Sequence, residues 1–134
     1  MGVVSFIPNL TKAAYRHLEA AELLMADPAQ RKDVAGYLYG IAAECAIKAM
    51  VVPLKLLPDV KHEIQYEHFP KLRTLLRDAL GGRRAKPLTV FVFDDAFMNN
   101  WHVSMRYADA AQIRDTWIGV WQKQAKDAVG AMGT

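Results

Sequence analysis

Apolar residues recur every three or four positions along much of the chain, and this spacing places them on one face of an α-helix. The first such stretch predicts a helix over residues 10–26, which Asn9 or Thr11 would cap. Its apolar face is formed by Leu10, Ala14, His17, Ala21 and Leu24.

A second helix is predicted from Asp27 to about Val52. Asp27 is a good N-cap residue, Pro28 suits the first helical position, and Gln30 completes the spacing of a capping box. Pro53 would end this helix. Because the connection to the first helix is short, the two are expected to form an antiparallel hairpin.

The second half of the chain has a less regular pattern. Residues 53–68 predict a loop with at most a helical turn, and the leucines that follow predict a third helix over residues 69–80, ending at Gly81. Residues 89–93 are expected to lead, in an extended form, into a fourth helix capped by Asp94.

The predicted fourth helix carries large apolar residues at helical spacing, namely Phe97, Met98, Trp101 and Met105. A last helix would begin at the capping-box spacing of Asp109 and Gln112. The sequence therefore predicts one all-α domain over residues 1–134, with a core at about residues 10–130. Its architecture would be an up-and-down bundle of four to five helices.

Two charges interrupt the longest apolar stretch, residues 34–54. Its length would permit a membrane span, but Glu44 and Lys48 in its middle favour the central helix of a bundle. They are four residues apart with the acid first, which suits an ion pair. A buried carboxylate needs a partner, which is either Lys48 alone or also Arg106 from the fourth helix. We interpret Glu44, Lys48 and Arg106 as a structural ion network.

Composition agrees with a globular chain. Of the 134 residues, 52% are apolar and 23% are charged, and the single cysteine, Cys45, rules out an internal disulfide. The first nine residues lack the basic and apolar pattern of a secretory leader. A cytoplasmic location without a membrane partner is expected.

The net charge of +3 is unevenly distributed: residues 71–86 carry +5, which leaves −2 for the rest. Clustered lysines and arginines attract phosphate groups. The candidate residues for contacting a nucleic acid or another phosphate are Arg77, Arg83, Arg84 and Lys86. A solvated surface is the alternative interpretation of the same cluster.

The central apolar stretch also carries a family resemblance. Residues 36–50, GYLYGIAAECAIKAM, resemble the A-x-E-C-x-x-K helix of the HEPN family (higher eukaryotes and prokaryotes nucleotide-binding domains). His68, which precedes a leucine-bearing helix, is similar to that family's H-x-L-x-x-L segment, and Arg106-Tyr107 resembles its late R-Y element. The resemblance covers about residues 10–130.

This resemblance implies a helical bundle that is commonly dimeric and acts with nucleotides or RNA. Members occur beside nucleotidyltransferases, in toxin–antitoxin pairs and in antiviral defence. The expected function is therefore a homodimeric binding module. It would engage RNA, a nucleotide, or a partner protein such as a nucleotidyltransferase or an antitoxin.

Whether the chain is an enzyme stays open. Ribonuclease members of the family carry an arginine followed, after four to six residues, by a histidine, and no arginine here has that spacing. His102 and Arg106 occur in the opposite order. On a helix they would share a face and combine acid–base catalysis with phosphate stabilisation. A metal-independent ribonuclease using this pair is one alternative, and a purely structural dimerisation domain is another.

No metal or cofactor is expected. The histidines and acids of residues 62–68 do not have the H-E-x-x-H spacing of a zinc site. No glycine-rich phosphate loop and no nucleophile elbow occurs either.

Overall fold

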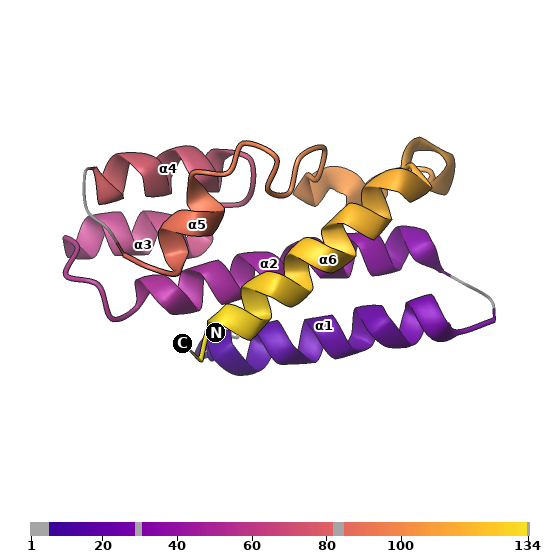
Figure 1. Ribbon diagram of the computed structural model, residues 1–134, viewed down its shortest axis with the longest axis horizontal. Helices are drawn as coiled ribbons and strands as arrows, with labels where there is room; N and C mark the ends of the chain where they lie inside the picture. Colours follow the sequence, from indigo (N-terminus) through magenta and orange to yellow (C-terminus); the bar gives the residue numbers. More distant parts are fainter. Residues whose placement is uncertain (1–5, 29–30, 82–84, 134) are drawn as a thin grey trace, which may run out of the picture.

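A computed structural model describes residues 6–28, 31–81 and 85–133, and all regular structure within these ranges is helical. The prediction of an all-α chain is confirmed. The described part has six α-helices and two 3-10 helices (Figure 1). They are α1 (Leu10–Ala26), α2 (Lys32–Val51), α3 (Pro58–Tyr66), α4 (Lys71–Leu80), α5 (Leu88–Val92), η1 (Val103–Tyr107), η2 (Ala110–Gln112) and α6 (Asp115–Ala131).

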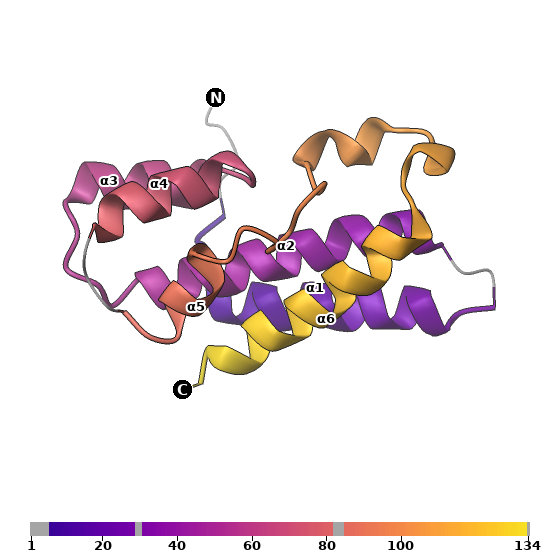
Figure 2. The same ribbon diagram turned by 45° about the horizontal axis from the view of Figure 1, so that its top comes forward.

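The three long helices form one layered unit, in which α1 and α2 run side by side and α6 crosses them obliquely (Figures 1 and 2). Eleven of the 20 residues of α2 are buried. By length and composition α2 is also apolar enough to cross a membrane, but 61% of that stretch is buried inside the fold. Much of its apolar surface is therefore covered by neighbouring elements, as in the core helix of a bundle.

Two tryptophans pack against glycines of α2. A Cβ atom added at Gly40 would lie 1.9 Å from the ring of Trp101, and one at Gly36 would lie 3.1 Å from the ring of Trp121. The Trp101 Nε1–H also donates to the backbone oxygens of Gly36 (3.2 Å) and Tyr37 (3.3 Å). Glycine at position 40 is thus required for this close approach of an indole to a helix backbone.

The ends of α1 and α2 differ in part from the prediction. Asn9 does cap α1, because its side chain accepts from the backbone N–H of Lys12. Asp27, however, is the C-cap of α1, and α2 begins only at Lys32 without a side-chain cap. The predicted capping box at Gln30 lies outside the described residues.

The segment predicted as a loop contains α3, which lies beside α4 at one end of the molecule (Figures 1 and 2). Only Ile64 of α3 is buried, so the helix leaves little apolar periodicity in the sequence. The predicted extended segment at residues 89–93 is also wrong, because α5 is a helix there. The third predicted helix is confirmed as α4, which ends at Gly81 with a φ of +54°.

The predicted fourth helix does not exist. Residues 94–102 form turns, in which Met98 (φ 57°) and Asn100 (φ 69°) adopt the left-handed conformation that an α-helix excludes. The side chain of Gln124, from α6, holds this segment. Its Oε1 accepts from the Met98 N–H and its Nε2 donates to the Ala96 oxygen, each at 2.9 Å. The apolar spacing therefore reflects burial of Trp101 and its neighbours rather than a helix.

The start of the last helix also differs from the prediction. Asp109 accepts from the backbone N–H of Ala111, but it caps only the short η2. The long helix α6 begins later, at Asp115, with Arg114 at its N-cap position.

Candidate functional site

The least exposed charged residue in the described part of the chain is Glu44, on the inner side of α2. Glu44 is 2% exposed and Lys48 is 7% exposed, and these are the only buried charged residues among those described. The carboxylate accepts from the Nδ1 of His68 at 2.8 Å and from the backbone N–H of Phe69 at 2.9 Å. Lys48 lies farther away, with its Nζ 3.9 Å from Oε1.

Lys48 satisfies its charge partly at another helix. Its Nζ donates to the backbone oxygen of Gln65 at 3.0 Å, near the C-terminal end of α3, where helix carbonyls carry partial negative charge. Lys48 and Glu44 therefore connect α2 to α3 and to the start of α4. We call Glu44, Lys48 and His68 the α2–α4 cluster.

Burial changes the protonation equilibria in this cluster. It raises the pKa of Glu44, although Lys48, His68 and the Phe69 N–H favour the ionised form. It lowers the pKa of Lys48, against the attraction of Glu44. The other members of the cluster favour the charged forms, but burial has the larger effect, so the pKa of Glu44 is raised and that of Lys48 is lowered overall.

The structure places Arg106 away from this cluster, so the prediction that it completes the ion network is wrong. Arg106 is exposed on η1, and its guanidinium lies 5.1 Å from the ring centre of Tyr107. The reason is the missing fourth helix: without it, residue 106 does not face the middle of α2. His68 takes the expected place of the arginine.

His102 and Arg106 do not form the predicted pair on one helical face. His102 precedes η1 in an extended conformation, and its Nδ1 lies 2.7 Å from Ser104 Oγ and accepts from the Ser104 N–H. Both side chains are exposed, and no hydrogen bond or ion pair joins them within the described structure. This geometry does not orient the imidazole for catalysis together with Arg106.

The basic segment is partly neutralised by a neighbour that the sequence spacing does not reveal. Arg77 donates through Nη2 to Asp95 at 2.7 Å and through Nε to the backbone oxygen of Val92 at 2.8 Å. It is therefore engaged in holding α4 to α5. Lys86 is exposed, whereas Arg83 and Arg84 lie outside the described residues.

A second polar network joins the three long helices, and the sequence analysis missed it. Glu22 of α1 accepts from the Tyr39 hydroxyl of α2 at 2.7 Å and from Gln122 of α6 at 2.8 Å, and it pairs with Lys126 at 2.6 Å. Burial alone would raise the pKa of Glu22, but these partners together lower it. A glutamate within a leucine-rich helix is the one signal that pointed to it.

His68 is the functional candidate that spacing arguments could not place. Its Nδ1 faces the carboxylate of Glu44, while its side chain is 39% exposed. The need of a buried carboxylate for a partner was the available signal. Among the described residues no group of three or more histidines, cysteines or acids is arranged to hold a metal ion.

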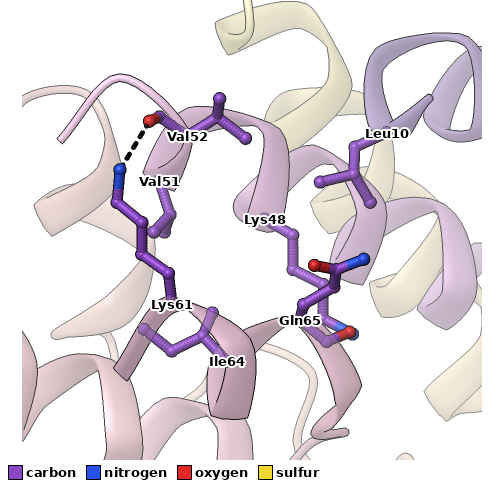
Figure 3. A pocket seen from close by; sticks show the side chains of 7 residues that line it. All are labelled: Leu10, Lys48, Val51, Val52, Lys61, Ile64 and Gln65. Atoms are coloured by element: carbon purple, nitrogen blue, oxygen red, sulfur yellow. Dashed lines mark hydrogen bonds between the residues drawn. The ribbon is translucent and has the colours of Figure 1, made fainter. Parts of the chain in front are cut away.

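A small cavity lies between the last turn of α2, α3 and the start of α1, and Lys48 forms part of its lining (Figure 3). Its volume is about 150 Å³.

Comparison with known proteins identifies no relative. No model of a protein family matches the chain, and neither does any curated protein or solved structure.

Proposed function

We propose that the chain is a helical binding module of the HEPN type that acts as a homodimer. The kinship is supported by one convergence: Glu44 and Lys48 of the resembling helix and His68 of the resembling H segment meet in a single cluster, in which Glu44 and Lys48 are buried. The two segments resemble the family independently of each other, because each resemblance rests only on the local sequence. A four- to five-helix bundle of that type, with the short α5 as an addition, accommodates the all-α architecture.

The geometry favours binding over catalysis by His102. That imidazole is engaged with Ser104, and Arg106 lies against Tyr107. The ribonuclease alternative needs both groups to converge on one phosphate.

The surface of α1 favours a protein partner. Leu23 is 73% exposed and Tyr15 is 47% exposed, although large apolar side chains of a helix usually face the core of the protein. Leu23 also borders a shallow hollow with Leu18, Glu19 and Glu22. By contrast, Arg77 of the basic segment is already paired, which weakens the argument for RNA.

The charges on this face are self-complementary, and this is the observation that carries the homodimer. Lys12, Arg16, Glu19 and Leu23 follow one exposed stripe, with the basic residues towards the N-terminal end of α1. When two copies of α1 are laid antiparallel, Arg16 of each lies opposite Glu19 of the other. The face would thus pair with itself, as a two-fold interface requires.

Sedimentation equilibrium tests this proposal through a charge exchange. Arg16→Glu and Glu19→Arg should each weaken the dimer, because like charges then face one another. Combining them should restore it. Leu23→Lys should abolish it, because in the same arrangement Leu23 lies opposite Lys12 of the other copy, whereas Val120→Lys, on the open face of α6 with 52% exposure, should not.

A monomeric wild-type chain, or a Leu23→Lys variant that dimerises as well as the Val120→Lys control, contradicts the proposal. A salt-sensitive complex with a single-stranded RNA, weakened by Lys86→Glu, would instead support the nucleic-acid alternative. An antitoxin or a nucleotidyltransferase, and a cytoplasmic setting, remain further proposals from the resemblance alone.

A further inference from the structure

A second hollow lies between the two 3-10 helices and the first turns of α6, and its volume is about 180 Å³. We call residues 102–113, which include η1 and η2, the arch. In Figure 2 the arch lies beside α2 and the start of α6. None of its residues is buried, so every side chain of the arch stays at least partly accessible from solvent.

The buried part of the lining is aromatic, and the exposed part is polar without charge. Trp121 is 1% exposed and Trp117 is half-buried. The indole N–H of Trp121 is already donated to the backbone oxygen of Asn99 at 2.8 Å, so this ring offers a ligand only its carbon surface. The other residues of the lining, none of them charged, are Asn100, Ser104, Met105, Ala108, Gln112 and Ile113.

Two amide side chains of the lining have unused hydrogen-bonding capacity. Asn100 and Gln112 are exposed, and neither side chain bonds another residue that the structure describes. Each amide group has two N–H donors and an acceptor oxygen. Ser104 differs, because its hydroxyl lies 2.7 Å from the Nδ1 of His102. The two amides are therefore available to a ligand in the hollow.

Charge, polarity and size together restrict this ligand. A charged ligand would lose part of its hydration without gaining an opposite charge, and an aliphatic ligand would cover the amides without bonding them. The volume is below the usual range for a drug-sized molecule but sufficient for a ring of the size of benzene. An uncharged heteroaromatic ring meets these conditions, because its faces are apolar and its edge carries donors and acceptors.

We propose that this hollow binds an adenine base, with the ring against Trp117 and the edge bonded by Asn100 and Gln112. Asparagine and glutamine amides match the amino group and the ring nitrogen of adenine as a donor–acceptor pair. Arg114 lies over Trp117, with its guanidinium 5.2 Å from the ring centre, but it does not line the hollow. No residue of α1 lines the site, so it does not rest on the proposed dimer.

Two nucleosides of the same shape test this proposal, namely adenosine and purine riboside, which lacks only the amino group. Titrations are followed by the nitrogen-correlated NMR signals of the tryptophan indoles and the side-chain amides. Adenosine should shift the signals of Trp117, Asn100 and Gln112 in a saturable way. It should bind about tenfold more tightly than purine riboside, because the amino group supplies the donor of the pair.

Variants of the two amides separate a built site from general attraction to aromatic surface. Gln112→Leu changes an exposed position and should remove most of the preference for adenosine over purine riboside. Asn100→Gly should also reduce it, and glycine tolerates the left-handed backbone at this position. Gln65→Leu, in α3 at the opposite end of the molecule, is the matched control and should leave the preference unchanged (Figures 1 and 2).

The proposal is overturned by equal affinity for the two nucleosides, by the absence of a saturable shift at Trp117, or by the same loss in Gln112→Leu and Gln65→Leu. Tighter binding of methyl glucoside than of adenosine would overturn it in favour of a sugar site. A short oligoadenylate that binds more tightly than adenosine supports a site for single-stranded nucleic acid. One that binds no more tightly supports a site for a free nucleoside.

Discussion

The long helices and the segment between residues 58 and 107 are held in place in different ways. In α1, α2 and α6, apolar side chains recur along the whole length of each helix and pack against one another. In the intervening segment the elements are short, and single side chains bond their backbone: Glu44 of α2 at Phe69, Gln124 of α6 at Met98 and, within the segment, Arg77 of α4 at Val92. Helices of fewer than about 12 residues are marginal alone, so this segment depends on those bonds together with the burial of apolar side chains such as Leu72, Leu76 and Trp101.

The two glutamates of the core show the same contrast. Glu22 is surrounded by donors from α2 and α6 and has a lowered pKa, whereas Glu44 is more deeply enclosed and has a raised pKa. Glu22 thus stabilises the long-helix layer by being ionised. Glu44 fixes the position of its neighbours although its own burial opposes its charge.

The largest effect is expected for Glu44→Ala. Lys48 and the Phe69 N–H would lose their buried partner, which should cost about 3–5 kcal/mol of unfolding free energy. Chemical denaturation measures this, with Glu63→Ala on the exposed surface of α3 as the control, expected within about 0.5 kcal/mol of wild type. A Glu44→Ala protein as stable as that control would show that the cluster does not hold the two regions together.

Gly40→Ala should cost about 2–4 kcal/mol, because the new Cβ would overlap the ring of Trp101 and displace it. The matched control is Gly119→Ala in α6, where no atom lies within 4 Å of the new Cβ. That change should stabilise the fold by up to about 1 kcal/mol. Similar thermal melting temperatures for both variants would exclude the close packing of Trp101 on α2.

Arg77→Met should have a smaller effect, about 1–2 kcal/mol, by removing the bond to the Val92 oxygen and the exposed pair with Asp95. The substitution should accelerate hydrogen exchange of the backbone amides more in α5 than in α1. Lys71→Met, which loses only an exposed i,i+4 pair with Glu67, is the comparison. If α5 exchanges alike in both variants, Arg77 is free for another role, including phosphate binding.

The smallest effects concern pH. Because the pKa of Glu22 is lowered in the fold, its stabilisation is present above the unfolded pKa and is lost as the pH falls through the folded pKa. Glu44 has a raised pKa, so its contribution becomes more favourable as the pH falls through its folded pKa. Glu22→Gln should therefore make the acid loss of stability shallower, and Glu44→Gln should make it steeper. Changes of the same sign would contradict these assignments.

Sequence periodicity predicted what depends on local pattern. The bounds of α1, the existence of α2 and α6, and the range of α4 follow from apolar spacing and from Asn9 and Gly81 at their ends. The burial of Glu44 and Lys48 also followed, because charges within an apolar helix need each other.

What could not be predicted depends on contacts between distant segments. Residues 94–102 have the apolar spacing of a helix, yet Trp101 is buried by packing on Gly40, and the left-handed Met98 and Asn100 interrupt the backbone. The partner of Glu44 is 24 residues away along the chain, at His68, and no spacing rule selects it. Arg106 was a reasonable candidate only as long as a fourth helix was assumed.

Native-state hydrogen exchange of the Glu44→Gln variant tests most directly whether Glu44 joins the long helices to the segment of residues 58–107. The substitution keeps the size of the side chain but removes the charge that accepts from His68 and Phe69. We expect protection of the α4 amides to fall about ten- to hundredfold, with the most protected amides of α1 and α6 much less affected. An equal loss of protection in α4 and α6, or no loss in α4, would contradict the role assigned to Glu44.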